Sequence, residues 1–212
     1  MNIETQFPCR FYINLGRSDE RRQKMDSLFM EQGLEIPRQP AIHGNWLRSG
    51  RDYANTNRRA VAMSKRLTIR RARAAGASSL LLMEDDLIFH PEWRERLEGI
   101  TLPDDWGIFM LGAIHLKKPD VVSPGLVRCK FAVDHHAVAF RACHFTAISK
   151  AMRPSSDMTE FNPNMTSDVR VAKLMESIPA YAAWPNLVWQ DNPHYDASGS
   201  QTLFPEAIPD CV

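Results

Sequence analysis

The sequence predicts an α/β fold, in which helices cover a central β-sheet. The first observation is a wholly apolar run at residues 79–83 that is followed at once by three carboxylates at 84–86. Such a run is typical of a strand that is buried on both faces. The second is a strand-like run at residues 11–15 followed by a helical pattern that Gly33 ends, which together make a β–α unit.

Helices are predicted where apolar residues recur every three or four positions. The longest runs from about Thr56 to Ala75. A shorter helix begins at Pro91, whose ring suits a first helical turn, and acidic residues follow it, as the helix dipole favours. Two more are expected at about 144–152 and after a cap at Thr166 or Ser167.

Further strands are predicted from short apolar runs rich in β-branched and aromatic residues. They lie within 34–42 and at 106–112, 126–129, 136–140 and 180–184. Residues 154–163 are polar, contain prolines and show no periodicity, so we expect a loop over the site. The tail from Pro185 onward is expected to contain no regular element.

The composition predicts one globular domain over residues 1–212, because 44% of the residues are hydrophobic and 24% are charged. The first residues show no signal peptide, and no apolar run approaches the roughly 18 residues of a membrane span, so a cytoplasmic location is expected. The 4 cysteines lack a C-x-x-C spacing, which favours packing roles over a zinc site or a disulfide framework.

Charge is distributed unevenly along the chain. Residues 1–80 contain 15 Lys and Arg against 7 Asp and Glu, although the whole chain carries only +1. This excess suggests an anionic ligand such as a nucleotide, a lipid-sugar phosphate or nucleic acid.

Glu84, Asp85 and Asp86 form a compact set of hard oxygen ligands at the end of the predicted central strand. Ligands of open α/β sheets bind outside the carboxyl ends of the strands, and such oxygens suit Mg²⁺ or Mn²⁺ that carries phosphates. Because side chains alternate along a strand, Glu84 and Asp86 can share a face while Asp85 contacts a nucleoside or a backbone amide. The alternative is a solvated acidic turn or helix cap.

Two groups of basic residues are candidates for anion binding. Asn14, Arg17, Arg21 and Arg22 surround the first predicted strand-to-helix turn, where guanidinium groups can fork onto a diphosphate. The alternative is a solvated basic helix face.

The second group is an arginine stripe on the predicted long helix, formed by Arg59, Arg66, Arg70 and Arg73. It is either a solvated face or a surface for a polyanion such as DNA.

Several short motifs follow one another in a characteristic order. They are Ile13-Asn14-Leu15 with Arg17 and residues 19–22, Ala41-Ile42-His43-Gly44, Ala62-Met63-Ser64, residues 81–86, His136-Ala137-Val138, Asp168, and residues 185–190. Together they span roughly residues 11–200. Their order resembles glycosyltransferase family 25, the lipooligosaccharide galactosyltransferases of bacteria and their collagen-modifying relatives.

The resemblance implies a single Rossmann-like domain of the GT-A type with a mixed, mostly parallel central sheet. It places a nucleotide-sugar half at about 8–112 and an acceptor half at about 113–212. It also implies inverting transfer of galactose or glucose from a UDP-sugar to an acceptor hydroxyl, most simply on a lipopolysaccharide-type glycan. Ala60, Lys65 and Val138 depart from the Gly, His and Tyr usual in the family, which leaves the sugar and even the activity open.

The same resemblance assigns a metal site that holds Mn²⁺ or Mg²⁺. Asp86 is the first choice of ligand, with Glu84 or Asp85 beside it and His194 or Asp191 completing the coordination. The alternative for His194 is an ordinary surface histidine.

Catalytic and binding roles follow in the same way. An inverting enzyme needs a base for the acceptor hydroxyl, and Asp168 is the candidate, with a first-turn helix acid as the alternative. His136 would orient acceptor or diphosphate, or else serve as a buried structural histidine. Ser64 and Gln190 are expected at the nucleotide-sugar site.

Two other functions remain open. The arginine stripe would fit a phage-type glycosyltransferase that modifies hydroxylated bases in DNA. The family departures would fit a catalytically degenerate module that binds a nucleotide or a partner. A generic dinucleotide or P-loop protein is disfavoured, because neither G-x-G-x-x-G nor G-x-x-x-x-G-K-[ST] occurs.

Overall fold

The computed structural model describes residues 1–47, 53–153 and 166–191, and within this range it leaves out the side chains of residues 53–55. The predicted loop at 154–163 and most of the tail therefore lie outside the described residues. In chain order the elements are α1 (Ile3–Gln6), β1 (Cys9–Asn14), α2 (Asp19–Glu31), β2 (Arg38–Pro40), η1 (Gly44–Leu47), α3 (Tyr53–Ala74), β3 (Ser79–Met83), β4 (Leu87–Phe89), α4 (Trp93–Glu98), β5 (Ile108–Met110), β6 (Ile114–Lys117), β7 (Asp120–Ser123), β8 (Leu126–Arg128), β9 (Phe131–Val133), β10 (Ala137–Arg141), η2 (Ala142–His144), α5 (Phe145–Ala151), α6 (Ser167–Ala172), η4 (Lys173–Glu176), β11 (Ala180–Ala183) and β12 (Val188–Gln190).

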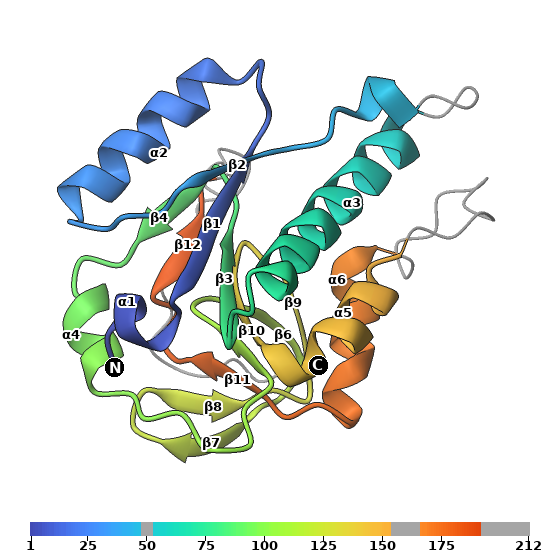
Figure 1. Ribbon diagram of the computed structural model, residues 1–212. Helices are drawn as coiled ribbons and strands as arrows, with labels where there is room; N and C mark the ends of the chain where they lie inside the picture. Colours follow the sequence, from blue (N-terminus) through green and yellow to red (C-terminus); the bar gives the residue numbers. More distant parts are fainter. Residues whose placement is uncertain (48–52, 154–165, 192–212) are drawn as a thin grey trace.

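The centre of the fold is an eight-stranded sheet with the order β2-β1-β3-β10-β5-β11-β8-β7. Strands β2, β1, β3, β5, β11 and β7 run in one direction, whereas β10 and β8 run in the opposite direction. The predicted α/β class with a mixed, mostly parallel sheet flanked by helices is therefore confirmed (Figure 1).

Two apolar cores lie on opposite faces of this sheet. Leu81 and Met83 of β3 pack in the core that includes residues of α1, α2 and α4, whereas Leu80 and Leu82 pack in the core with α3, α5 and α6. This division follows from the alternation of side chains along a strand. Each fully buried Leu contributes roughly 1.5–3 kcal/mol of transfer free energy, so the two layers of helices hold β3 from both sides.

The topology gathers polar segments at one edge of the sheet. Strands β1, β2 and β3 are parallel, so residues 84–86 meet Asn14 and the segment after Pro40 at their carboxyl ends. Strand β10 is antiparallel to β3 with Ala137 opposite Met83, so the residues just before β10 reach the same edge.

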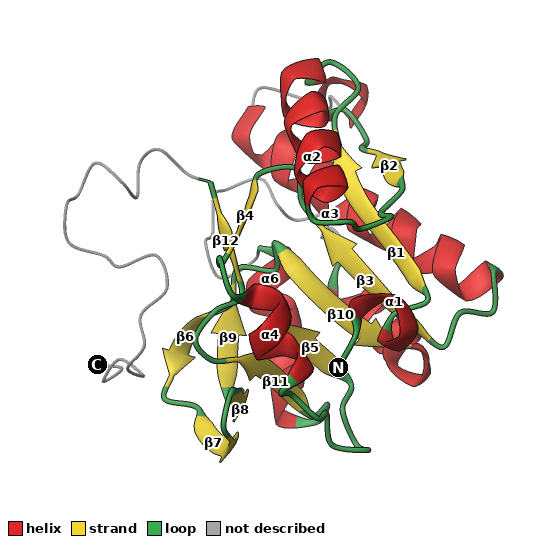
Figure 2. Cartoon of the chain, turned by 90° about the vertical axis from the view of Figure 1, so that its left-hand side faces the viewer, coloured by secondary structure: helices red, strands yellow, loops and turns green. Residues whose placement is uncertain are grey.

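The prediction of a tail without regular structure is wrong for β12. This strand pairs antiparallel with β4, with Gln190 opposite Leu87 (Figure 2). A three-residue strand has no periodicity that identifies it, and its partner lies about a hundred residues earlier in the sequence, so only tertiary pairing stabilises it. Within the described residues, no helix combines the length and apolar character needed to cross a membrane.

Candidate functional site

A cavity of about 470 Å³ opens at the carboxyl edge of β1, β2 and β3. Its lining combines the acidic triplet with basic, hydroxyl and apolar side chains from four segments. They are Ile13, Leu15, Arg17, Ser18, Arg21, Ala41, Ile42, His43, Gly44, Asn57, Ala60, Val61, Ser64, Lys65, Glu84, Asp85 and Asp86. The structure thus brings the first β–α turn, the segment after β2, the start of α3 and the triplet into one site.

Asp85 is held by the first β–α unit. The Asn14 amide donates to Asp85 Oδ2 at 2.7 Å, and the Arg21 guanidinium lies 3.1 Å from Asp85 Oδ1. Asn14 is itself buried and accepts a hydrogen bond from Arg38 Nε at 2.9 Å. These contacts hold Asp85 in place through strand β1. The negative charge of the Asp85 carboxylate is therefore already compensated within the protein.

Asp86 keeps one oxygen without a protein partner among the described residues. Its Oδ2 accepts a hydrogen bond from Gln190 Nε2 at 3.1 Å and lies 3.5 Å from Arg21, whereas the buried Oδ1 has no hydrogen-bond partner. Burial is the main cause that raises the pKa of Asp86 to about 6, and the neighbouring charge of Glu84 adds to it. A buried carboxylate oxygen left unsatisfied in this way is available for a cation or a hydrogen-bond donor.

Glu84 points to a buried lysine on α3. The ammonium of Lys65 lies 2.7 Å from Glu84 Oε1 and 3.5 Å from Asp168 Oδ1, and it donates to the carbonyl of His135 at 3.3 Å. The Lys65 side chain is only 2% exposed. Burial alone would lower the pKa of Lys65, but the charges of Asp168 and Glu84 outweigh it and hold that pKa above its usual range.

Asp168 lies at the start of α6, which Thr166 caps through a hydrogen bond to the Val169 amide. Its carboxylate accepts from the His135 amide at 3.3 Å and from the Ser167 hydroxyl at 3.1 Å. Burial alone would raise the pKa of Asp168, but the charge of Lys65 outweighs it and holds that pKa well below its usual range. Asp168 is therefore ionised at neutral pH and paired inside the protein.

His136 is also enclosed by the fold. Its Nε2 lies 3.1 Å from the Val188 carbonyl, and its Nδ1 lies 3.2 Å from Asp134 Oδ2. Burial opposes protonation, but the contact with Asp134 outweighs it and raises the pKa of His136. Gly112 permits this arrangement, because a Cβ there would lie 1.9 Å from the Val188 carbonyl oxygen.

Ser64 is buried beneath the loop that follows β2. Its hydroxyl donates to the Ala60 carbonyl at 2.7 Å and accepts from the Ile42 amide at 2.8 Å. The hydroxyl therefore connects the segment after β2, which lines the cavity, to α3. Gly44 approaches α3 so closely that a Cβ there would lie 2.2 Å from Asn57 Oδ1, so a larger residue would require the Asn57 side chain to move.

The predicted basic residues separate into two groups. Arg17 and Arg21 line the cavity, whereas Arg22 pairs with Asp19 on α2 at 3.4 Å and does not line it. The arginine stripe of Arg59, Arg66, Arg70 and Arg73 lies along α3 and contributes no residue to the cavity lining.

The predicted metal ligands are brought together only in part. Within residues 1–47, 53–153 and 166–191 there is no group of three or more His, Cys, Asp or Glu side chains arranged to hold a metal ion. Glu84 and Asp85 face cations and amides of the protein, so Asp86 Oδ1 is the oxygen that fits a metal. His194 lies outside the described residues.

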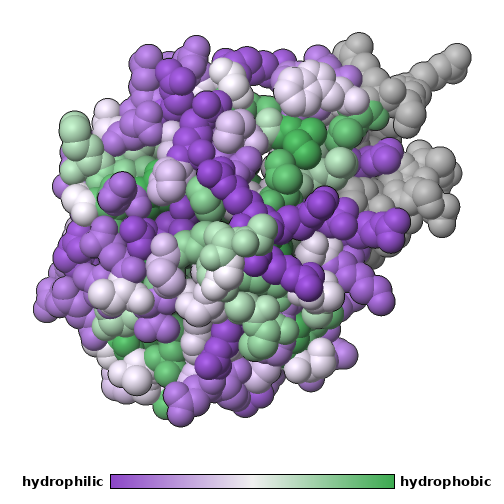
Figure 3. Space-filling model, viewed as in Figure 1, coloured by the Kyte–Doolittle hydropathy of each residue, from purple (hydrophilic) through white to green (hydrophobic). Residues whose placement is uncertain are grey.

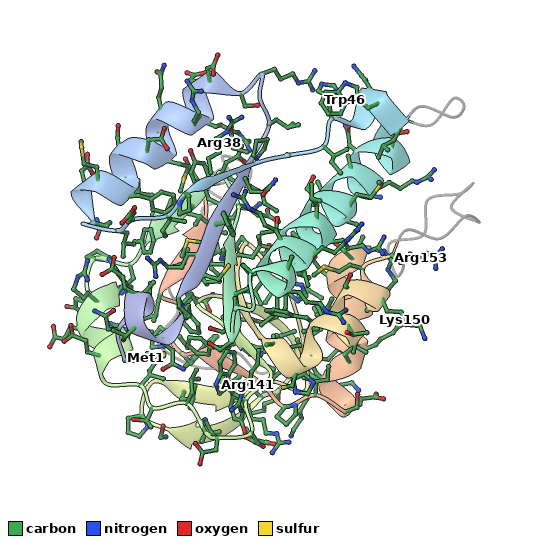
Figure 4. The ribbon with its side chains drawn as sticks, in the orientation of Figure 1. Met1, Arg38, Trp46, Arg141, Lys150 and Arg153 are labelled. Carbon is green, nitrogen blue, oxygen red and sulfur yellow. The ribbon has the colours of Figure 1, made fainter. Side chains whose placement is uncertain are left out.

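Sequence reasoning missed several residues of this network. Arg38, Asp134 and His135 hold Asn14, His136 and Lys65 in place, and no local motif marks them. Trp46 was also missed, although it is 77% exposed while the other four tryptophans are at most 9% exposed. It lies on η1 (Figure 4), and the centroid of its ring is 6.2 Å from that of the His43 ring.

No protein-family model matches the chain. A curated protein of Drosophila pseudoobscura pseudoobscura named "Glycosyltransferase 25 family member" is 33% identical over 103 residues. That match covers 40% of this chain and 16% of the relative, so this chain spans only a small part of the relative's length.

The solved structures that match have low sequence identity to this chain. A glycosyltransferase involved in glycosylation of the major capsid of PBCV-1 is 10% identical, with a TM-score of 0.44 over 81% of this chain and 76% of that one. A nucleoside-diphosphate-sugar pyrophosphorylase from Vibrio cholerae RC9 is also 10% identical, with a TM-score of 0.45 over 89% and 79%. The sequence match to the curated protein, in contrast, confirms the resemblance of this chain to glycosyltransferase family 25.

Proposed function

We propose that this chain is a glycosyltransferase that moves a hexose, galactose or glucose, from a UDP-sugar to an acceptor hydroxyl with inversion. The observation that carries the proposal is the cavity at the carboxyl edge of β1, β2 and β3, where an acidic triplet faces Arg17 and Arg21. This is the position at which open α/β sheets bind nucleotides. In this proposal the donor site belongs to about residues 8–112, and residues 113–212 contribute to the acceptor side.

The diphosphate of the donor would bind between the basic turn and the triplet. Arg17 and Arg21 offer planar guanidinium groups that can form bidentate hydrogen bonds with phosphate oxygens. Arg21 also touches Asp85 and Asp86, so it ties the anion-binding side of the cavity to its acidic side. Asn14 and Ser64 have positioning roles in this proposal, because Asn14 holds Asp85 and Ser64 holds the loop after β2 by hydrogen bonds.

Mn²⁺ or Mg²⁺ fits this site through Asp86. Magnesium is commonly held by one or two carboxylates together with substrate phosphates and water, so one free carboxylate oxygen suffices as a protein anchor. When bound, a divalent cation would neutralise charge on the departing diphosphate. Glu84, Asp85 and His194 remain proposed as further ligands, and Gln190 would orient Asp86 through its hydrogen bond.

The geometry supports a positioning role for Asp168 and His136. A general base works best with a pKa near the working pH, whereas the pair with Lys65 holds the pKa of Asp168 far lower. Proton acceptance by Asp168 would require this pair to open. Both ring nitrogens of His136 already face protein groups, so His136 would orient the edge of β10 and β12.

The function is tested with a panel of nucleotide sugars in the presence of Mn²⁺ or EDTA, with UDP release and thermal shift measured together. We expect one UDP-sugar to stabilise the protein and to be cleaved only with metal. Asp86→Asn should abolish both effects, while Asp104→Asn, an exposed carboxylate remote from the cavity lining, serves as the matched control. If no donor stabilises the wild-type protein, the proposal fails.

The acceptor that we propose is a lipopolysaccharide-type glycan. The DNA alternative has less support, because none of the four arginines of the stripe belongs to the lining of the cavity at β1, β2 and β3. A catalytically degenerate module would bind UDP in the same panel but would cleave none of the nucleotide sugars.

A further inference from the structure

A second charged cleft lies between α3 and α5, with a volume of about 240 Å³. Five cationic side chains surround it, and no carboxylate belongs to its described lining. The lining residues are Arg66, Ile69, Arg70, Arg73, Phe145, Thr146, Ser149, Lys150 and Arg153. Lys150 and Arg153 project outward on the α5 side (Figure 4), and hydrophilic side chains dominate this part of the surface in Figure 3.

Two of the guanidinium groups are held in place by α5. Arg66 Nε donates to the Ser149 carbonyl at 2.9 Å, and Arg73 NH1 donates to the Thr146 hydroxyl at 3.3 Å. Each group keeps further N–H donors beyond these contacts, because a guanidinium has five. Anchoring reduces the side-chain freedom that a ligand would otherwise have to restrict.

The five cations have no counter-charge among the described residues. None of them takes part in the ion pairs that the described residues form, whereas the exposed Arg21 and Lys24 and the buried Lys65 all do. Helix dipoles explain only part of this cluster. Arg73 and Lys150 lie in the last turns of α3 and α5, where cations are favoured, whereas Arg66 and Arg70 lie before the last turn of α3.

We propose that this cleft binds a phosphate group, borne either by a free phosphorylated ligand or by a lipid headgroup. Guanidinium groups recognise phosphate oxygens in bidentate fashion, and several cations suit a dianion. The hydroxyls of Thr146 and Ser149 add neutral donors, and Ile69 and Phe145 contribute the apolar part of the lining. The inference does not depend on the glycosyltransferase proposal, because the two linings share no residue.

The first test measures binding of inorganic phosphate by calorimetry and of vesicles by co-sedimentation. The vesicles contain either phosphatidylcholine alone or phosphatidylcholine mixed with phosphatidylglycerol. We expect binding of free phosphate, or selective binding of the phosphatidylglycerol vesicles, and the arm that responds identifies the source of the phosphate.

Substitution of the cleft arginines tests whether any binding observed takes place at the cleft. Arg66→Gln with Arg70→Gln should weaken it by about tenfold or more, since hydrogen bonds to charged groups contribute this much. Arg70→Gln alone, at an exposed position, should weaken it measurably without risk to the α3–α5 contact. The matched control is Lys117→Gln with Arg128→Gln, which removes the same charge from exposed positions on β6 and β8.

Three outcomes overturn the proposal. They are absence of binding in both arms, equal weakening by the control pair, and strongly salt-dependent binding of a duplex DNA without binding of phosphate or vesicles. UDP binding at the donor cavity, measured in the same samples, should remain unchanged in all cleft variants. Failure of UDP binding in the wild-type protein would count against the glycosyltransferase proposal and leave this one standing.

Discussion

Helix α3 lines two charged regions that differ in whether their charges are paired within the protein. At the proposed donor cavity, which lies at the carboxyl edge of β1, β2 and β3, every carboxylate of the triplet touches a cation or an amide: Glu84 meets Lys65, Asp85 meets Asn14 and Arg21, and Asp86 meets Gln190. The α3–α5 cleft is lined by five cations, and no carboxylate belongs to its described lining.

The difference shows which charges the fold itself requires. Removing one partner of a buried pair leaves an uncompensated charge, so the donor side is coupled to stability. An exposed cluster of like charges contributes little to folding and is free to meet a ligand. Substitutions in the two regions should therefore differ in their effect on stability.

Lys65→Met should lower the free energy of unfolding by about 3–5 kcal/mol, because Glu84 and Asp168 would lose their buried cation. Urea denaturation measures the change. The matched control is Lys24→Met, which removes a lysine from the exposed pair with Asp191 and should cost less than about 1 kcal/mol. Equal effects of the two variants would show that Lys65 is not the centre of a buried charge network.

Asp86→Asn should reduce transfer from the UDP-sugar by about 10²-fold or more, since it removes the carboxylate proposed to hold the metal. Stability should be retained or rise slightly, because the buried carboxylate is crowded by Glu84 and its pKa is raised to about 6. Activity assays and thermal melts on the same preparation check both parts. Loss of folding together with activity would contradict this separation.

Two buried histidines should weaken the fold as the pH falls from 6.5 to about 4, whereas proton uptake by Asp86 and His136, whose pKa values are raised, should offset part of this loss. Burial lowers the pKa of His115 and His135 to about 4, so the unfolded chain takes up protons first as the pH falls through 6.5. Between pH 7 and pH 5 each histidine should cost about 2 kcal/mol of unfolding free energy.

Urea midpoints for the wild type, His115→Asn and His135→Asn at both pH values measure this effect. Each variant should show a smaller loss between pH 7 and pH 5 than the wild type. An unchanged pH slope in both variants would assign the acid sensitivity to other groups.

Arg70→Gln with Arg73→Gln should change the free energy of unfolding by no more than about 0.5 kcal/mol, because these exposed cations have no described ion pair to lose. Relief of the repulsion between the cations of the cleft would raise the free energy of unfolding slightly. Thermal melts at low ionic strength provide the measurement. A loss of more than about 2 kcal/mol would mean that the cleft is structural and that the contrast with the donor cavity is wrong.

The sequence was sufficient to locate the main elements of the donor cavity. Apolar runs bounded by turn residues identify β1 and β3, and open α/β sheets bind ligands at the carboxyl ends of their strands, so Asn14 and the triplet were each expected beside a phosphate-bearing ligand. Gln190 was expected at the nucleotide-sugar site, and the structure places it next to Asp86.

Pairings across the fold could not be predicted in this way. Lys65 follows Ser64 in a polar stretch of α3, and only the packing of α3, β10 and α6 buries it between Glu84 and Asp168. The arginine stripe was visible, but Lys150 and Arg153 join it only because α5 packs on α3. Such long-range contacts leave no local pattern in the sequence.

The most direct test of the account is calorimetric titration of UDP into the wild-type protein and Asp86→Asn, with and without Mn²⁺. The account predicts that UDP binds the wild type more tightly when Mn²⁺ is present and that Asp86→Asn removes this dependence on metal, while Asp104→Asn behaves as the wild type. Absence of UDP binding, or equal binding by the wild type and Asp86→Asn under both conditions, would contradict the assignment of the cavity at β1, β2 and β3 as a metal-assisted nucleotide-sugar site.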